Sequence, residues 1–346
     1  MATLQNTLTG LRNQFDPSGS GQITPDTLSQ PSTLSFIADD VARAAASAIP
    51  VAPTVAAPGA PYRAFYVFGD SLSDTGNVSL ATAGLVPVSP PYADHSFSNG
   101  PVWAQDLAQD LGLPALQPSL AGGTDFAYGG AETGQTSVHT LNPTDLPSQF
   151  GQFLAQVPSP QAGALYGVWI GSNDVLDIAN NTSLTAPQQQ SDVSAAVNNE
   201  VSVISGMAAH GAQNLLVLNV PDLGKTPYET ARGPAVAQSA SSLASLYDTE
   251  LATALRPLEA SGALKVDLVD AFSVLNRVAA NPGAYGFTDV ADPVWSGNLT
   301  SSSSSGTLHA TGSAQNQSLF FDSLHPTAQA HALLASGIAE GLTGTA

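Results

Sequence analysis

The sequence contains no cysteine, and only 10% of its 346 residues are charged. The absence of cysteine excludes disulfides, thiolate metal sites and a cysteine nucleophile. Only 8 Lys and Arg residues oppose 27 Asp and Glu residues, which gives a formal net charge of −19. Because few cations are present to neutralise phosphate, we exclude nucleic-acid binding and electrostatic attachment to anionic lipid as functions. Strong acidity favours a dissolved monomer, which is the state we expect.

Long hydrophobic runs are also missing, although 43% of the residues are hydrophobic. No apolar stretch approaches the roughly 18 residues that a membrane-spanning helix needs, so the sequence predicts no transmembrane segment. Residues 1–15 show neither the basic region nor the apolar core of a Sec-type signal peptide. The composition, with few lysines and high acidity, nevertheless favours a secreted or extracellular bacterial protein.

Residues 1–60 form a distinct N-terminal segment. Apolar residues recur at helical spacing within residues 4–15 and again around residues 34–48, which predicts a helical appendage. Residues 49–61 contain four prolines and a glycine, a composition typical of a stiff linker. We therefore predict two parts, the appendage over residues 1–60 and one large domain over residues 61–346.

A loop in the predicted appendage resembles an EF-hand calcium loop. Asp16, Ser18 and Ser20 stand at the first three ligand positions, and glycine follows at the sixth position. The twelfth position holds Thr27 in place of the bidentate glutamate that completes the calcium shell. We interpret the loop as a degenerate remnant, and we expect no cofactor in the chain.

From residue 64 onward, short apolar runs alternate with helical patterns. The runs predict strands at 64–68, 166–170, 215–220 and 265–269, and the patterns predict helices near 100–111, 191–209, 236–260 and 327–341. Short strands that are apolar throughout are typical of a parallel sheet buried on both faces. The sequence therefore predicts an α/β fold, a three-layer α/β/α sandwich with a mostly parallel sheet. Residues 298–318, rich in serine and threonine, are predicted to form a loop.

A serine follows the first predicted strand. Residues 65–77 read FYVFGDSLSDTGN, so Ser71 lies just beyond the carboxyl end of a buried strand. Reactive groups of parallel sheets gather at that end. For an isolated Gly-Asp-Ser, however, a serine that merely caps a helix is the more frequent explanation. The functional interpretation therefore depends on the rest of the chain.

Five segments resemble, in order, the sequence blocks of the GDSL or SGNH hydrolase family, most closely the branch of bacterial phospholipase/esterase-type enzymes and plant GDSL esterases. They are residues 65–77, 124–131 (TDFAYGGA), 170–174 (IGSND), 219–227 (NVPDLGKTP) and 321–327 (FDSLHPT). One departure is Asp125, which stands where asparagine is commoner. The likeness covers about residues 64–342 and implies a flavodoxin-like strand order.

The resemblance implies a catalytic triad and an oxyanion hole. It assigns Ser71 as the nucleophile, His325 as the base and Asp322 as its partner. His325 follows Asp322 by three positions, so one tight turn can bring the two side chains together. It assigns the oxyanion to the backbone N–H groups of Ser71 and Gly130 and the side-chain amide of Asn173. Taken alone, Gly130 could be a turn glycine and Asn173 a helix cap. The chain has no Gly-x-Ser-x-Gly, which argues against an α/β-hydrolase.

The sequence thus predicts a serine esterase or lipase that hydrolyses carboxylic esters through an acyl-enzyme on Ser71. Alternatives are a lipid acyltransferase or phospholipase of the same family, or a catalytically silent binding or surface protein with the same fold. We expect a small-molecule or lipid ester as the substrate. No His, Asp and Glu residues have the spacing of a catalytic metal site.

The walls of the substrate pocket are expected to come from two loop segments. These are residues 84–99 and 283–318, which lie outside the predicted helices and strands. Trp103 and Trp295 are candidates for the walls, whereas core packing is the better explanation for Trp169, which lies within a predicted strand.

Overall fold

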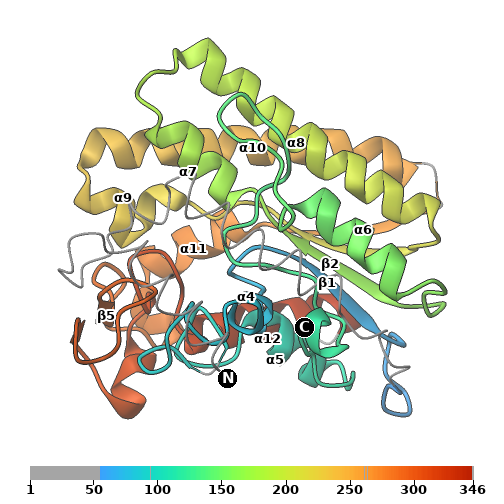
Figure 1. The fold of residues 1–346 in the computed structure, drawn as a ribbon, viewed down its shortest axis with the longest axis horizontal. Helices are drawn as coiled ribbons and strands as arrows, with labels where there is room; N and C mark the ends of the chain where they lie inside the picture. Colours follow the sequence, from blue (N-terminus) through green and yellow to red (C-terminus); the bar gives the residue numbers. More distant parts are fainter. Residues whose placement is uncertain (1–54, 94, 261, 263, 345–346) are drawn as a thin grey trace, which may run out of the picture.

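The centre of the fold is a sheet of four parallel strands in the order β1-β2-β3-β4 (Figure 1). The computed structural model describes residues 55–344 except 94, 261 and 263. The strands are β1 (Phe65–Gly69), β2 (Leu165–Trp169), β3 (Asn214–Leu218) and β4 (Lys265–Val269). Each strand coincides closely with a predicted one, so the predicted parallel α/β sheet is confirmed.

A short segment pairs with the other edge of β1. The N–H of Val67 donates to the carbonyl of Thr124 at 3.0 Å, and the N–H of Phe126 donates to the carbonyl of Val67 at 2.7 Å. The parallel bridge between Val67 and Asp125 stands in the place of a second strand of the chain. With this segment included, the spatial order is the flavodoxin-like 2-1-3-4-5. The carboxyl end of β1 is therefore the switch point at which ligands bind in such sheets.

Helices cover both faces of the sheet (Figure 1). One layer contains α6 (Leu146–Gln156), α7 (Ser172–Asn180), α8 (Ala186–Ala209) and α10 (Pro234–Ala260). The opposite layer contains α5 (Trp103–Asp110), α12 (Ala328–Thr343) and the start of α11 (Ala271–Ala280). The remaining short elements are α4 (Asn77–Ala81), α9 (Pro227–Ala231), the hairpin of β5 (Trp295–Ser296) and β6 (Thr307–Leu308), and the 3₁₀ helices η1 (Ser119–Ala121), η2 (Leu223–Lys225), η3 (Pro282–Tyr285) and η4 (Gly312–Gln317).

The alternation of side chains in β1 shows how the core holds the sheet. Tyr66 and Phe68 point into the cluster that includes α6, α8 and α10, whereas Phe65 and Val67 point into the cluster with α5 and α12. All four are buried. Burial of one such side chain is worth about 1.5–3 kcal/mol, so β1 is a rigid base for the residues that follow it.

Two features differ from the sequence predictions. The hydrophobic pattern of the sequence did not predict α6, α7 and α11, which are short helices of 11, 9 and 10 residues. The predicted loop over residues 298–318 contains β6 and η4. The reason lies in Trp295, whose buried ring packs so closely against Gly297 and Gly306 that a Cβ at either glycine would clash with it. The two glycines allow the hairpin to fold around the indole.

The N-terminal predictions fall mainly outside the described residues. The Asp16, Ser18 and Ser20 loop, both predicted helices of the appendage and residues 49–54 of the linker lie there. The boundary at residue 60 remains a prediction. Among the described residues, no helix combines the length and hydropathy required to cross a membrane.

Candidate active site

The turn after β1 is held in place from two sides. Gln149 clamps the backbone of Gly69, because its Oε1 accepts the Gly69 N–H at 2.9 Å and its Nε2 donates to the Gly69 carbonyl at 2.8 Å. The carbonyl of Asp70 accepts the N–H groups of Ser73 and Asp74 at 3.1 and 3.0 Å. These bonds make a tight turn that presents Ser71 at the carboxyl edge of the sheet.

The structure brings the three predicted triad residues together. Oγ of Ser71 lies 2.9 Å from Nε2 of His325, although the two residues are 254 positions apart. Nδ1 of the same ring lies 2.7 Å from Oδ2 of Asp322. Oδ1 of Asp322 accepts the N–H groups of Leu324 and His325 at 2.8 and 2.7 Å, which closes the loop into one tight turn. The Thr327 side chain then caps α12 directly after this turn.

Tyr92 is a fourth member of this group that sequence reasoning missed. Its hydroxyl donates to Oδ2 of Asp322 at 2.7 Å, and the side chain is buried. The sequence related Tyr92 to the site only because it lies within residues 84–99, which were predicted to form part of the pocket wall. Because a phenol that donates favours the ionised carboxylate, Tyr92 helps to keep Asp322 charged.

Burial and charge act in opposite directions on the triad. Burial alone would raise the pKa of Asp322, but the nearby His325 and the donors around the carboxylate lower it overall. Burial alone would lower the pKa of His325, but Asp322, with a smaller contribution from Asp70, raises it overall. The imidazole is therefore a stronger base than an isolated histidine, which suits it for accepting the serine proton.

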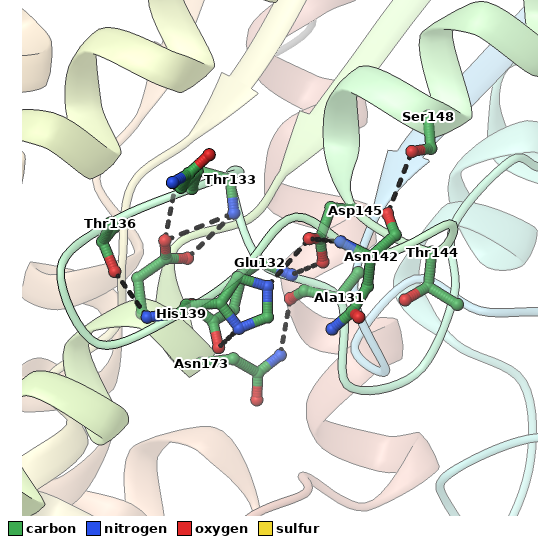
Figure 2. A network of polar contacts seen from close by, with 12 residues as sticks. Ala131, Glu132, Thr133, Thr136, His139, Asn142, Thr144, Asp145, Ser148 and Asn173 are labelled. Carbon is green, nitrogen blue, oxygen red and sulfur yellow. Dashed lines mark hydrogen bonds and ion pairs between the residues drawn. The ribbon is translucent and has the colours of Figure 1, made fainter. Parts of the chain in front are cut away.

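The two other predicted oxyanion donors also lie at this edge of the sheet. The Asn173 amide donates one hydrogen to the Ala131 carbonyl at 2.8 Å, which fixes its orientation and leaves the second hydrogen available (Figure 2). Oδ2 of Asp74 accepts the N–H of Gly129 at 2.9 Å and so anchors the turn before Gly130. Asn173 and Gly130 both line the same cavity as Ser71.

Two neighbouring glycines in this turn have different structural reasons. Gly130 has a φ of +80°, a backbone conformation that favours glycine. A Cβ at Gly130 would meet no atom of the described residues within 4 Å, whereas a Cβ at Gly129 would clash with the ring of Phe97.

The structure also accounts for aspartate at position 125. Its Oδ2 accepts the Thr75 N–H at 2.7 Å and the Thr75 hydroxyl at 2.6 Å, and its Oδ1 accepts the Ala127 N–H at 2.9 Å. All three partners are donors, so a side chain with two acceptor oxygens satisfies them. The departure from the family pattern therefore leaves the turn between β1 and Gly130 intact.

A cavity of about 670 Å³ opens around Ser71, His325 and Asn173. Apolar side chains line it on two sides. Between α11 and α12 these are Val274, Leu275, Val278, Leu319, Phe320 and Leu333, and near the Gly130 turn they are Val78, Val86, Val138, Leu176 and Leu299. Its size is within the range of about 300–1,000 Å³ typical of small-molecule sites.

Both predicted wall segments contribute to the cavity, but the two tryptophans that were candidates for its walls do not. Val86 comes from residues 84–99 and Leu299 from residues 283–318. Trp169 is buried in the core against Trp103, as expected, and it also borders the cavity. Trp103 and Trp295 are not among the lining residues of the cavity. They are buried elsewhere in the fold.

A buried histidine lies behind the Gly130 turn. His139 places Nδ1 2.8 Å from Oε1 of Glu132 and Nε2 2.8 Å from Oδ2 of Asp145 (Figure 2). Within the described part of the chain, Glu132, His139 and Asp177 also form a group whose possible ligand atoms lie within 4.8 Å of one another, which the sequence spacing did not indicate. A metal ion binds the lone pair of a neutral ring. Because both nitrogens already face carboxylates, the arrangement fits a protonated imidazole better than a metal ligand.

The chain is similar to known proteins over most of its length. Residues 65–338 match the family model described as GDSL-like lipase/acylhydrolase. A phosphatidylcholine-sterol acyltransferase of Aeromonas hydrophila is 31% identical over 233 residues, which are 67% of this chain and 65% of that protein. An acetylesterase of Thermothelomyces thermophilus is 27% identical over 292 residues (80% and 87%), and a GDSL esterase/lipase of Arabidopsis thaliana is 28% identical over 269 residues (65% and 71%). This chain belongs to the GDSL-like lipase/acylhydrolase family.

Proposed function

We propose that the chain hydrolyses carboxylic esters as a serine esterase or lipase. The observation that carries the proposal is the hydrogen-bonded series from Ser71 through His325 to Asp322, which opens into an apolar cavity. In this assignment Ser71 is the nucleophile, His325 is the general base, and Asp322 orients the ring and stabilises its charged form.

The first half of the reaction forms an acyl-enzyme. Oγ of Ser71 attacks the acyl carbon while Nε2 of His325 takes the serine proton. The carbonyl oxygen becomes an oxyanion, which accepts hydrogen bonds from the N–H groups of Ser71 and Gly130 and from the Asn173 amide. The tetrahedral intermediate then breaks its bond to the alkoxy oxygen, and His325 gives its proton to the leaving alcohol.

The second half regenerates the enzyme. A water molecule gives a proton to His325 and attacks the acyl carbon, and the same donors hold the new oxyanion. The bond to Oγ of Ser71 breaks, Oγ recovers the proton from His325, and the carboxylic acid leaves. No redox or metal step is needed to balance these reactions.

The cavity supports a small-molecule or lipid ester as the substrate. Its walls beside Ser71 are mainly aliphatic, which suits an acyl chain or an apolar alcohol. The relatives carry different names, since one is an acetylesterase and another a phosphatidylcholine-sterol acyltransferase. We therefore leave the acyl length open within this class.

Acyl transfer to an alcohol is the second candidate function, and the name of the Aeromonas relative favours it. The acyl-enzyme on Ser71 would be the same, and an alcohol would replace water in the second half. Incubation with an ester and an added alcohol distinguishes the two, because a transferase yields the new ester and a hydrolase yields mainly the free acid.

The decisive assay uses p-nitrophenyl esters with short, medium and long acyl chains. Wild type should release p-nitrophenol with at least one chain length, and Ser71→Ala should lower kcat by about 10⁴-fold or more. Equal rates for both proteins with every ester would refute the proposal and leave a catalytically silent binding or surface protein as the better explanation.

A further inference from the structure

We infer that His139 is a positioning residue for this site, and the inference rests on the proposed function. Held between Glu132 and Asp145, it fixes the loop of residues 129–146 so that the Gly130 N–H and the Asn173 amide face Ser71. His139 touches no reacting atom in this assignment and acts through the backbone of the loop.

The contacts of the ring tie the two ends of the loop together. Glu132 and Asp145 stand seven and six residues away from His139 along the chain, and each contacts one ring nitrogen at 2.8 Å (Figure 2). Asp145 also accepts the N–H groups of Glu132 at 3.1 Å and of Asn142 at 2.6 Å. The Leu146 N–H donates to the Glu132 carbonyl at 3.0 Å. The loop is therefore closed around the ring at several points.

Glu132 is the connection between the ring and the oxyanion donors. The residue before it, Ala131, accepts the hydrogen bond that orients the Asn173 amide. The residue after it, Thr133, donates its N–H and its hydroxyl to the Asp174 carboxylate on α7, at 3.0 and 2.6 Å for the shortest contacts. A shift of Glu132 would therefore move both the loop and the amide that serves the site.

Charge explains why a cation is needed at this position. Glu132 and Asp145 are buried, and the further acids Asp174 and Asp177 on α7 face Glu132. Burial alone would lower the pKa of His139, but the Asp145 and Glu132 carboxylates raise it to about 10. Burial raises the pKa of Glu132 well above its ordinary value, and the contact with His139 opposes that rise. Without the protonated ring, Glu132 and Asp145 would lose the donor that they share, and the ring would no longer join the two ends of the loop.

The test compares His139→Ala with His210→Ala, which removes an exposed histidine at the end of α8. A shift of donor groups by about 1 Å costs on the order of 10²-fold, so we expect His139→Ala to lower kcat by about 10- to 100-fold with KM nearly unchanged. A trifluoromethyl ketone, which forms an oxyanion on the serine, should lose affinity by a similar factor. Added imidazole should restore part of kcat in His139→Ala, and His210→Ala should match wild type.

The inference is wrong if kcat per folded molecule, counted by circular dichroism, is unchanged in His139→Ala. It is also wrong if only KM changes, because a positioning role acts on the transition state. Should the alanine variant fail to fold, His139→Gln retains size and one donor and replaces it in the same comparison.

A measurement without substrate separates this inference from the proposed function. The side-chain amide signal of Asn173 in an isotope-labelled protein, assigned by its loss in Asn173→Asp, should shift in His139→Ala and stay in place in His210→Ala. An unshifted signal would overturn the positioning role. Absence of Ser71-dependent hydrolysis in wild type would instead refute the proposed function, while the amide signal still decides the role of His139.

Discussion

Substitution of Asn173 by alanine gives the sharpest prediction about the proposed chemistry. The amide has two hydrogens, and the structure shows one of them donated to the Ala131 carbonyl at 2.8 Å. The second hydrogen is the one proposed to meet the oxyanion. Loss of a single oxyanion donor costs about 2.7–4 kcal/mol, so kcat should fall by about 10²–10³-fold. KM should change little, because the neutral carbonyl of bound substrate gains less from this donor than the oxyanion does.

The same substitution has a structural cost that must be measured separately. The Ala131 carbonyl loses its partner, and an unsatisfied buried acceptor costs about 1–3 kcal/mol. Asn173 is only half-buried, so we expect the lower end of that range. Urea unfolding measures this loss of stability. The fraction of folded Asn173→Ala protein that it gives is then used to express kcat per folded molecule.

The assay is the steady-state hydrolysis of the preferred p-nitrophenyl ester. Asn173→Asp serves as the matched variant, because it keeps the shape and removes the donor. It should be at least as slow as Asn173→Ala, since a carboxylate near the developing oxyanion repels it. Turnover close to that of wild type in a folded Asn173→Ala protein would refute the oxyanion assignment.

Three further predictions follow from the same geometry. Asp322→Asn should lower kcat by about 10⁴-fold. In wild type Asp322 holds the pKa of His325 above 6.5, and without the carboxylate burial is the main influence on that pKa and lowers it. The acid limb of the pH–rate profile should therefore move to lower pH, and an unmoved limb would contradict this. Tyr92→Phe removes a hydrogen bond to a charged, buried group and should destabilise the protein by about 1.5–3 kcal/mol in urea unfolding; unchanged stability would show that this bond contributes nothing. The Asp145 and Glu132 carboxylates raise the pKa of His139 from 6.5 to about 10 in the folded protein. The contribution of His139 to the stability of the fold should therefore be complete below pH 6.5 and disappear as the pH rises through about 10. A stability difference between wild type and His139→Gln that grows over this pH interval would contradict the protonated ring.

The positions of Ser71 and Asn173 could be predicted because both depend on local sequence. Each follows an apolar run, and the carboxyl ends of parallel strands must meet at one edge of a sheet. The closeness of Asp322 and His325 is also local, since one turn spans them. The contact of Ser71 with His325 depended on the family resemblance, because no local pattern brings residues 254 positions apart together.

The parts that could not be predicted depend on long-range packing. Tyr92 meets Asp322 across 230 residues, and Gln149 clamps Gly69 across 80 residues. The ion pairs of His139 lie close in the chain, but they form inside an irregular loop whose path no periodic pattern describes. In the sequence, acidic residues six and seven positions away from a histidine do not indicate an ion pair, and such a histidine would be predicted to lie on the surface.

The central claim is that the hydroxyl of Ser71 is made nucleophilic by His325. Covalent labelling with a fluorophosphonate, followed by mass spectrometry of the peptide, tests it directly. Wild type should be labelled at Ser71, His325→Ala should react far more slowly at the same residue, and His210→Ala should react as fast as wild type. Labelling at another residue, or equal rates for wild type and His325→Ala, would contradict the account.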